Sequence, residues 1–334
     1  MSFESQQEVE RKILAILKVL SNTQGPVGSR LIARSLTSHG VELTERAVRY
    51  HLKLTDERGL TQLVRDRDGR VITEKGRREI ENALVTDKIG FVISRIELLA
   101  YRTSFNYEQA AGMLPVNVTF FPEAKFQKAL QVMAPAFEKG YCVSRRVAVA
   151  KGGERLGEAI VPANCVGLAT VCSIVVNGVL LKAGIPMDSR FGGVLQIQNH
   201  KPIRFTQLIH YNGTSLDPSE IFIKAKMTAV REATKTGGGA ILANFREIPA
   251  ICRPVAEKVI SGLRNAGVNG VLAMGDTSSK ICETNVELNK IGLILIGGLN
   301  PVAAAVEAGF ESESHSMNTI LEYGELSDYR KSLS

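Results

Sequence analysis

Three cations and one phenol share a stripe of a short segment in the first quarter of the chain. Successive residues of a helix turn by about 100°, so within Thr44–Arg58 one face carries Arg46, Arg49, Tyr50 and Lys53. The opposite face carries residues that can pack on a core, namely Ala47, Val48, His51, Leu52 and Thr55. Cations contact phosphates and long donors reach base edges. The segment therefore has the composition of a helix that enters a DNA groove.

The flanking residues predict the elements that would position this helix. An amphipathic helix over Glu8–Ser21 comes first, and Pro26 prevents its continuation. Ser29 is expected to cap a second helix over Arg30–Ser38, with Leu31, Ile32 and Leu36 facing inward. Thr44 is expected to cap the third helix in the same way.

A hairpin should follow. The β-like runs Leu60–Arg65 and Arg70–Thr73 flank the turn Asp66–Gly69, which ends in Asp-Gly. Arg65, Arg67 and Arg70 would lie near its tip, where they can follow a phosphate backbone. This order of elements predicts a winged helix-turn-helix DNA-binding domain over residues 1–86. Its expected DNA contacts are Thr44, Arg46, Arg49, Tyr50, Lys53, Arg65, Arg67 and Arg70.

Composition agrees with a DNA-binding protein and excludes several other classes. The stretch from Val27 to Arg78 has 12 Lys and Arg against 7 Asp and Glu, and so accounts for five of the seven net positive charges in the 334-residue chain. No apolar run is long enough to span a bilayer, and the acidic N-terminus is no signal peptide, so we expect a cytoplasmic protein without membrane contact. The five cysteines form no C-x-x-C pair, which indicates reduced thiols and no metal site.

The remainder of the chain reads as a second domain over residues 92–330. Strand-like and helical runs alternate there, for example a strand at 116–121, a helix at 124–140 and a strand at 240–245. The expected fold class is therefore α+β multidomain, a winged helix-turn-helix followed by a mixed α/β effector-sensing domain. The segments 177–185 and 300–310 both read as a helix that ends in Ala-Gly. This similarity is either an internal repeat or a generic helix stop.

A ligand site is expected where small residues concentrate, at Asn164–Gly193. Gly167–Ser173 could lead into a helix whose free N–H groups face a cavity, with Thr170, Cys172 and Ser173 as further donors. Arg190, beside Gly192 and Gly193, could bind a carboxylate through two hydrogen bonds. The alternative is that the small residues only allow close packing and that the arginine forms a structural salt bridge. Sequence motifs of hydrolases, zinc proteases and nucleotide-binding enzymes are absent.

Several of these runs resemble the archaeal nitrogen-regulation repressor (NrpR) family. Residues 27–33, 43–52 and 57–60 look like its N-terminal winged helix, and residues 171–173, 177–186 and 189–193 are similar to its effector domain. The resemblance implies a repressor that binds palindromic operators as a homodimer and that 2-oxoglutarate, acting as effector and not as cofactor, releases from DNA. Because a cysteine takes part in the family's effector response, the resemblance implies that Cys165 and Cys172 are candidate effector-binding residues.

The family also suggests a partner. Some members carry two effector domains, whereas this chain has room for one, so a separate protein with another effector domain is a plausible partner. The alternatives to a repressor are an α/β enzyme of small-molecule metabolism with an accessory winged helix, and a winged helix that docks on protein. A deep pocket with a paired acid, base or nucleophile would favour the enzyme.

Overall fold

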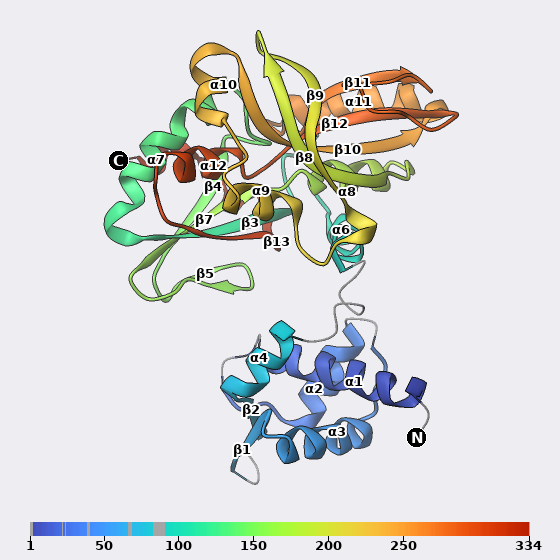
Figure 1. Cartoon of the computed structure of the whole chain (residues 1–334), viewed down its shortest axis with the longest axis vertical. Helices are drawn as coiled ribbons and strands as arrows, with labels where there is room; N and C mark the ends of the chain where they lie inside the picture. Colours follow the sequence, from blue (N-terminus) through green and yellow to red (C-terminus); the bar gives the residue numbers. More distant parts are fainter. Residues whose placement is uncertain are drawn as a thin grey trace. The chain divides into compact units, whose positions relative to one another are not determined.

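The structure is a computed structural model, and it describes residues 3–21, 23, 25–38, 41–65, 69–82 and 91–333. The chain forms two compact units, Met1–Lys88 and Ile89–Ser334 (Figure 1). None of the helices in the described ranges combines the length and the apolar character that crossing a membrane requires.

The first unit is a winged helix. It contains α1 (Phe3–Ser21), α2 (Ser29–Ser38), α3 (Glu45–Glu57), the antiparallel strands β1 (Thr61–Arg65) and β2 (Gly69–Ile72), and α4 (Glu74–Asn82). The three first helices meet in a core of apolar side chains at helical spacing, which are Ile16, Leu20, Ile32, Leu36, Val48 and Leu52. The predicted order of helices and hairpin is confirmed.

The start of α2 differs from the prediction. Ser29 is the first helical residue and not a cap, because the carbonyl of Gly28 accepts hydrogen bonds from the amides of Leu31 and Ile32. The Ser29 hydroxyl instead donates to Glu45 Oε1 at 3.2 Å. Ile32 and Leu36, which are four residues apart and therefore share a helix face, point inward as expected. Leu31 is 59% exposed, because its position on the helix turns it away from that face.

Two five-stranded antiparallel sheets form the second unit. The first has the order β13-β3-β7-β4-β14 and the second the order β11-β12-β10-β8-β9. The first sheet consists of β13 (Glu313–Glu322), β3 (Met113–Pro122), β7 (Cys165–Val171), β4 (Arg146–Lys151) and β14 (Ser327–Asp328). The second consists of β11 (Val271–Thr277), β12 (Lys290–Ile296), β10 (Gly239–Pro249), β8 (Asp188–Gln198) and β9 (Lys201–His210).

The helices of this unit are α6 (Phe91–Arg102), α7 (Glu123–Glu138), α8 (Ile174–Lys182), α9 (Pro218–Lys224), α10 (Val230–Thr236), α11 (Arg253–Asn265) and α12 (Asn300–Glu307). A small hairpin pairs β5 (Arg155–Leu156) with β6 (Ala159–Ile160). Short 3-10 turns cover Tyr211–Gly213, Ala250–Cys252, Tyr323–Glu325 and Tyr329–Ser332. The mixed α+β fold class is thereby confirmed.

The second unit contains two copies of the same arrangement of helices and strands. Apart from the small hairpin β5-β6, which is inserted between β4 and β7, a helix, a long strand, a helix, two further strands and a helix follow one another as α6-β3-α7-β4-β7-α8. The same series occurs again as α10-β10-α11-β11-β12-α12. The middle strands have matching sheet orders, β3-β7-β4 and β10-β12-β11. In both copies an Asn stands five residues before the Pro that ends the long strand, at 117 and 122 and at 244 and 249. The Ala-Gly segments noted in the sequence are α8 and α12, the same element in the two copies.

The last strand and helix of each copy pack against the other copy. The strand after α8 is β8, which pairs with β10, and the strand after α12 is β13, which pairs with β3. The helices cross over in the same way, since α8 packs on α11 and α12 packs on α7. Asn117 and Asn244, in the middle of the two long strands, and the starts of α8 and α12 therefore approach one another where the two halves interlock.

Candidate nucleic-acid interface and ligand pocket

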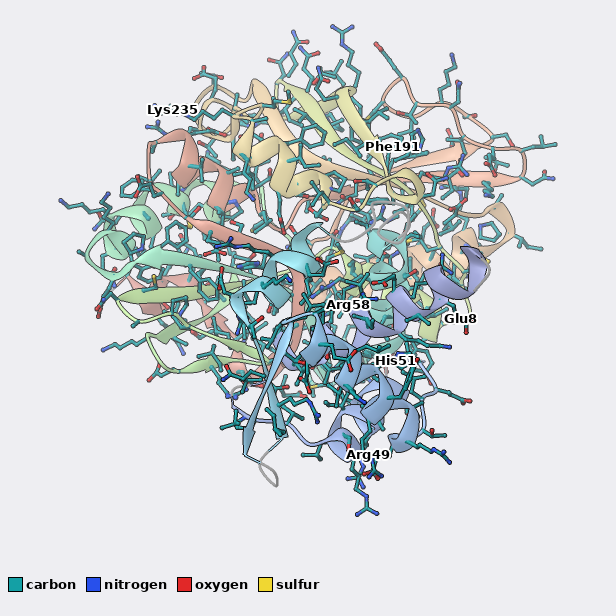
Figure 2. All side chains as sticks on the ribbon, turned by 60° about the horizontal axis from the view of Figure 1, so that its bottom comes forward. Glu8, Arg49, His51, Arg58, Phe191 and Lys235 are labelled. Atoms are coloured by element: carbon teal, nitrogen blue, oxygen red, sulfur yellow. The ribbon has the colours of Figure 1, made fainter. Side chains whose placement is uncertain are left out.

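The third helix of the winged unit exposes the stripe of residues that the sequence indicates. Thr44 caps α3 by accepting a hydrogen bond from the amide of Ala47 at 3.2 Å. Arg46, Arg49, Tyr50 and Lys53 are all exposed, while Val48, His51, Leu52 and Thr55 are buried. Figure 2 shows Arg49 pointing away from the body of the helix. Its contact with Glu45, 3.3 Å away on the preceding turn, is an exposed ion pair of small energetic value.

The hairpin is fastened to the end of α3. Asp56 accepts a hydrogen bond from Thr61 Oγ1 at 2.5 Å and one from Arg70 Nε at 2.7 Å. Gly69 has φ = +91°, and a Cβ there would lie 2.4 Å from the carbonyl carbon of Val27. The hairpin therefore needs glycine at this position.

The three arginines that were predicted to lie in the wing differ in their positions and contacts. Arg70 is paired with Asp56 and anchors the hairpin instead of lying free at its tip, contrary to the prediction. Arg65 ends β1, and nothing is described of its side chain. Arg67 lies outside the described residues.

A cavity lies in the second unit where the two halves interlock. It is lined by Ile96, Asn117, Cys172, Ser173, Ile174, Tyr211, Asp217, Ser219, Asn244, Arg246, Gly297, Gly298, Leu299, Ser316 and Met317. The set includes both repeated asparagines, the first residue of α8 and the residues just before α12. Neither helix has a side-chain cap at its first turn. Two helix N-termini, each with partial positive charge, thus border one space.

Polar side chains around this space are linked by a series of hydrogen bonds. Asn244 Nδ2 donates to Ser173 Oγ at 3.1 Å, and the Tyr211 hydroxyl donates to Asn244 Oδ1 at 2.5 Å. Arg246 Nη2 lies 3.5 Å from the Tyr211 hydroxyl, with the guanidinium 4.6 Å above that ring. On the other side, Asn117 Nδ2 contacts Thr170 Oγ1 at 3.4 Å.

Arg246 is the group that most needs a further partner. It is 1% exposed, and its Nε makes no hydrogen bond to any described residue. No carboxylate among the described residues forms a salt bridge with it. A buried cation with an unused donor is costly unless an anion is bound beside it.

Two other titratable groups of the pocket, Tyr211 and Cys172, are neutral near pH 7. Burial raises the pKa of Tyr211 to about 12 and that of the Cys172 thiol to about 12. Burial also raises the pKa of Asp217, although hydrogen bonds from its neighbours oppose this. Arg246 is the single cation among the lining residues, so the pocket suits a small anion.

The pocket is small. Its volume is about 20 Å³, close to the roughly 10–15 Å³ that one water molecule requires. A carboxylic acid of a few carbons is larger than this, so its walls must move apart when such a molecule enters.

Two of the predicted effector residues line the pocket, and two more border it. Cys172 and Ser173 lie in the wall at the start of α8. Thr170 is buried next to Asn117. Gly192 lies opposite Asn244 in the sheet, and a Cβ there would come within 2.9 Å of the Tyr211 hydroxyl.

The remaining three predicted residues lie elsewhere. Arg190 stands at a bulge of β8, where Ser189 pairs with Arg246 and Phe191 with Phe245. It contacts Glu287 at 2.7 Å and Asp188 at 3.1 Å, in the structural salt bridge named as the alternative. Cys165 begins β7 opposite Pro122, and Gly193 packs against Phe205 and the carbonyl of Gln207.

Arg246, Tyr211 and the two asparagines are among the pocket residues that the sequence analysis missed. A signal for them exists in the repeated Asn-x-x-x-x-Pro spacing at 117 and 244. Alternation along a strand would then have placed Arg246 on the same face as Asn244. Tyr211 carries no such signal, because it follows β9 in a separate turn.

Comparison with known proteins fits both units. The family model described as "NrpR regulatory domains NRD1 and 2" matches residues 89–328, and that of the ribonuclease R winged-helix domain matches residues 14–80. A crystal structure of a nitrogen repressor-like protein from Methanococcus jannaschii superposes with a TM-score of 0.61 at 24% identity, over 71% of this chain and 98% of that one. That likeness shows the fold.

Curated relatives are closer in sequence. The global nitrogen regulator NrpRI of Methanosarcina mazei is 39% identical over 95% of this chain and 97% of its own length. The global nitrogen regulator NrpR of Methanococcus maripaludis is 33% identical over 89% of this chain, which spans 52% of that longer protein. NrpR of Methanocaldococcus jannaschii is 32% identical over 97% of this chain and 56% of its own length.

A winged helix joined to a regulatory α/β domain defines a transcription regulator, and the family matched over most of the chain is one of regulators and not of enzymes. The match over residues 89–328 and the identity to NrpRI then specify which one. The chain belongs to the NrpR family of global nitrogen regulators.

Proposed function

We propose that this protein represses nitrogen-assimilation genes by binding palindromic operators as a homodimer. The exposed stripe Arg46, Arg49, Tyr50 and Lys53 on α3 carries the proposal, because it offers cations and long donors on a rigid helix. Thr44 contributes at the start of this helix. Arg65 and Arg67 contact phosphate from the wing, while Arg70 holds the wing in place.

2-Oxoglutarate is the proposed effector, and the pocket between α8 and α12 is its proposed site. One carboxylate faces the Arg246 guanidinium, since this buried cation has an unused donor. The second lies before the first turn of α12, at Gly298, because the amide of Gly297 already donates to the carbonyl of Leu242 at 2.9 Å. Cys172 and Ser173 complete the wall. Arg246 thereby takes the role that the sequence suggested for Arg190.

Release follows from unequal affinity of the effector for two arrangements of the dimer. DNA binding requires the two α3 helices to reach half-sites about one or more helical turns apart. The effector favours an arrangement that does not meet this spacing, and it shifts the population only by its difference in affinity for the two. A second chain with another regulatory domain is a further proposed partner, since the relatives from Methanococcus maripaludis and Methanocaldococcus jannaschii are about twice as long.

Replacing Arg49 by Ala should weaken operator binding by about 1–3 kcal/mol if the guanidinium reads a guanine. Gel-shift titration of the full chain measures this. The matched control is Arg78→Ala, which removes the same charge from α4, on the other side of the winged unit (Figure 1). Equal operator affinity for both variants and the unaltered chain would exclude α3 as the reading helix. Addition of 2-oxoglutarate to the same titration tests release, and an unchanged affinity would exclude it as effector.

A further inference from the structure

One wall of the ligand pocket is an irregular piece of strand. β13 pairs His315 with Val118 and Thr319 with Val116, so the bulge Ser316–Asn318 stands opposite Asn117 alone. Met317 in this bulge has φ = +51°, a left-handed backbone that residues with side chains rarely adopt. Ser316 and Met317 line the pocket. The bulge therefore holds a strained conformation next to the pocket.

Side chains from three other elements hold the bulge. Asn117 Oδ1 accepts a hydrogen bond from the Met317 amide at 3.1 Å, and Glu220 Oε1 accepts one from the Ser316 amide at 2.6 Å. Arg95 of α6 donates to the carbonyls of Met317 at 2.6 Å and Asn318 at 2.9 Å. Since Asn117 also lines the pocket, one end of this set of bonds is in reach of a ligand and the other end is on α6.

The apolar face of α6 forms part of the pocket wall through Ile96 and packs behind other wall residues. Val92, Ile96, Leu99 and Ala100 pack on Cys172, Ile174, Tyr211 and Met317, and these last four all line the pocket. The cluster has eight buried residues and is separate from the main core of the unit. By contrast, α12 and most of α8 are embedded in that main core. When the small pocket widens, α6 and the bulge are the walls with the least packing behind them.

We infer that Arg95 is a positioning residue that makes α6 follow the bulge when an effector enters the pocket. The inference rests on the proposed function and assigns its route of regulation. Widening at Asn117 and Met317 shifts the two carbonyls that Arg95 holds, and its planar guanidinium carries the shift to α6 as a unit. In the chain, α6 comes directly after residues 83–90, which connect it to the winged-helix unit. A ligand in the regulatory unit thus acts on the first helix that follows the DNA-binding unit.

The test compares Arg95→Gln with Arg102→Gln in the full chain. Both variants remove one arginine charge from α6, but Arg102 pairs with the exposed Glu158 at 3.2 Å and does not touch the bulge. The measured quantity is the ratio of operator Kd with and without saturating 2-oxoglutarate. We expect about 5-fold or more for the unaltered chain and for Arg102→Gln, as is usual for coupled sites, and a ratio near one for Arg95→Gln. Calorimetry should show that Arg95→Gln still binds 2-oxoglutarate.

Hydrogen exchange on the unaltered chain makes the test independent of how well the variant folds. Amides of residues 92–102 should change their protection when 2-oxoglutarate is added, beyond any change in the matched helix α11. A full ratio in Arg95→Gln, or unchanged exchange in α6 at concentrations that release DNA, would overturn the role of Arg95 alone. If 2-oxoglutarate leaves the operator affinity of the unaltered chain unchanged, the proposed function fails and this inference fails with it.

Discussion

Arg246 combines two properties that rarely occur together in a residue with only a structural role. Its side chain is almost fully buried, yet no carboxylate among the described residues neutralises it. Its contacts are the Tyr211 ring, the Tyr211 hydroxyl and the carbonyl of Phe245, the last at 3.4 Å. Such a cation lowers the stability of the empty protein and raises its affinity for an anion.

Exchange of Arg246 for Met, which has similar reach but no charge, separates these effects. Without ligand, the variant should unfold at the same temperature as the unaltered chain or at a higher one. With 2-oxoglutarate at about 100 times its Kd, the unaltered chain should gain about 2.7 kcal/mol and the variant little of it. Thermal unfolding with and without ligand measures both. Arg190→Met is the control outside the pocket, and a variant at 246 that keeps the full gain would rule out the proposed role.

His51 introduces a pH dependence into the winged-helix unit. Burial lowers the pKa of its imidazole, Lys12 adds to the effect, and Nδ1 has no hydrogen-bond partner among the described residues. The folded state therefore favours the neutral imidazole, whereas the histidine of the unfolded chain takes up a proton at about pH 6.5. Between the two pKa values the unfolded state binds more protons, so stability falls as the pH falls through this range.

Replacing His51 by Gln should reduce this dependence. Urea unfolding of the full chain, monitored by hydrogen exchange of the α3 amides, measures the free energy of unfolding of the winged-helix unit at neutral and mildly acidic pH. We expect the loss on acidification to be smaller in the variant than in the unaltered chain. An equal loss in both proteins would show that another group titrates.

Among the elements, α6 and α8 meet more closely than helices with ordinary side chains allow. A Cβ added to Gly178 in the middle of α8 would lie 2.3 Å from the Cβ of Thr103, which follows α6 and is fully buried. The glycine thus has a packing role, and it fixes the distance between the helix that begins at the pocket and the helix that covers it.

Gly178→Ala should force these two helices apart and lower stability by about 1–3 kcal/mol, the usual effect of overpacking. Denaturant unfolding of the regulatory unit measures the loss. Gly238→Ala is the control, because a Cβ there meets nothing closer than 3.7 Å. The double variant Gly178→Ala, Thr103→Gly should recover much of the loss, and a single variant as stable as the control would refute the close contact.

At the scale of the whole molecule, the internal repeat explains where the pocket lies. Two copies of one arrangement exchange their final helices and strands, so equivalent ends from both copies meet in the middle. The copies differ at the pocket, with Cys172 and Ser173 before α8 and with Gly297 and Gly298 before α12. Near α12 the backbone therefore approaches Val171 and Asn117 closely, whereas near α8 the side chains of Cys172 and Ser173 form the wall.

The proposed dimer makes operator affinity depend on half-site spacing. Insertion of about 5 base pairs between half-sites should turn one of them to the opposite face of the DNA and lower the affinity, while about 10 base pairs should restore part of it. Titrations of the full chain with these duplexes measure the effect. Equal affinity for all three spacings would indicate that each winged helix binds independently.

Local patterns in the sequence determined the elements and the face of α3. Side-chain directions around a helix depend only on residue number, so Arg46, Arg49, Tyr50 and Lys53 had to share a face once Thr44–Arg58 was helical, and the burial of Val48 and Leu52 fixed which face is outside. The small residues of Gly167–Ser173 likewise predicted a segment that leads into a helix, and Cys172 and Ser173 lie directly before α8 in the pocket wall.

Only the tertiary structure decided the rest of the pocket. Asn117, Ser173, Asn244, Gly298 and Met317 come from elements that are far apart in the chain and that meet through strand exchange between the two copies. One bulge in β8 turned Arg190 toward Asp188 and Glu287, and the salt bridge of Arg70 with Asp56 likewise depends on a fold-level contact. Periodicity fixes which way a side chain points from its own element, whereas the partner it meets there depends on which other elements pack against it.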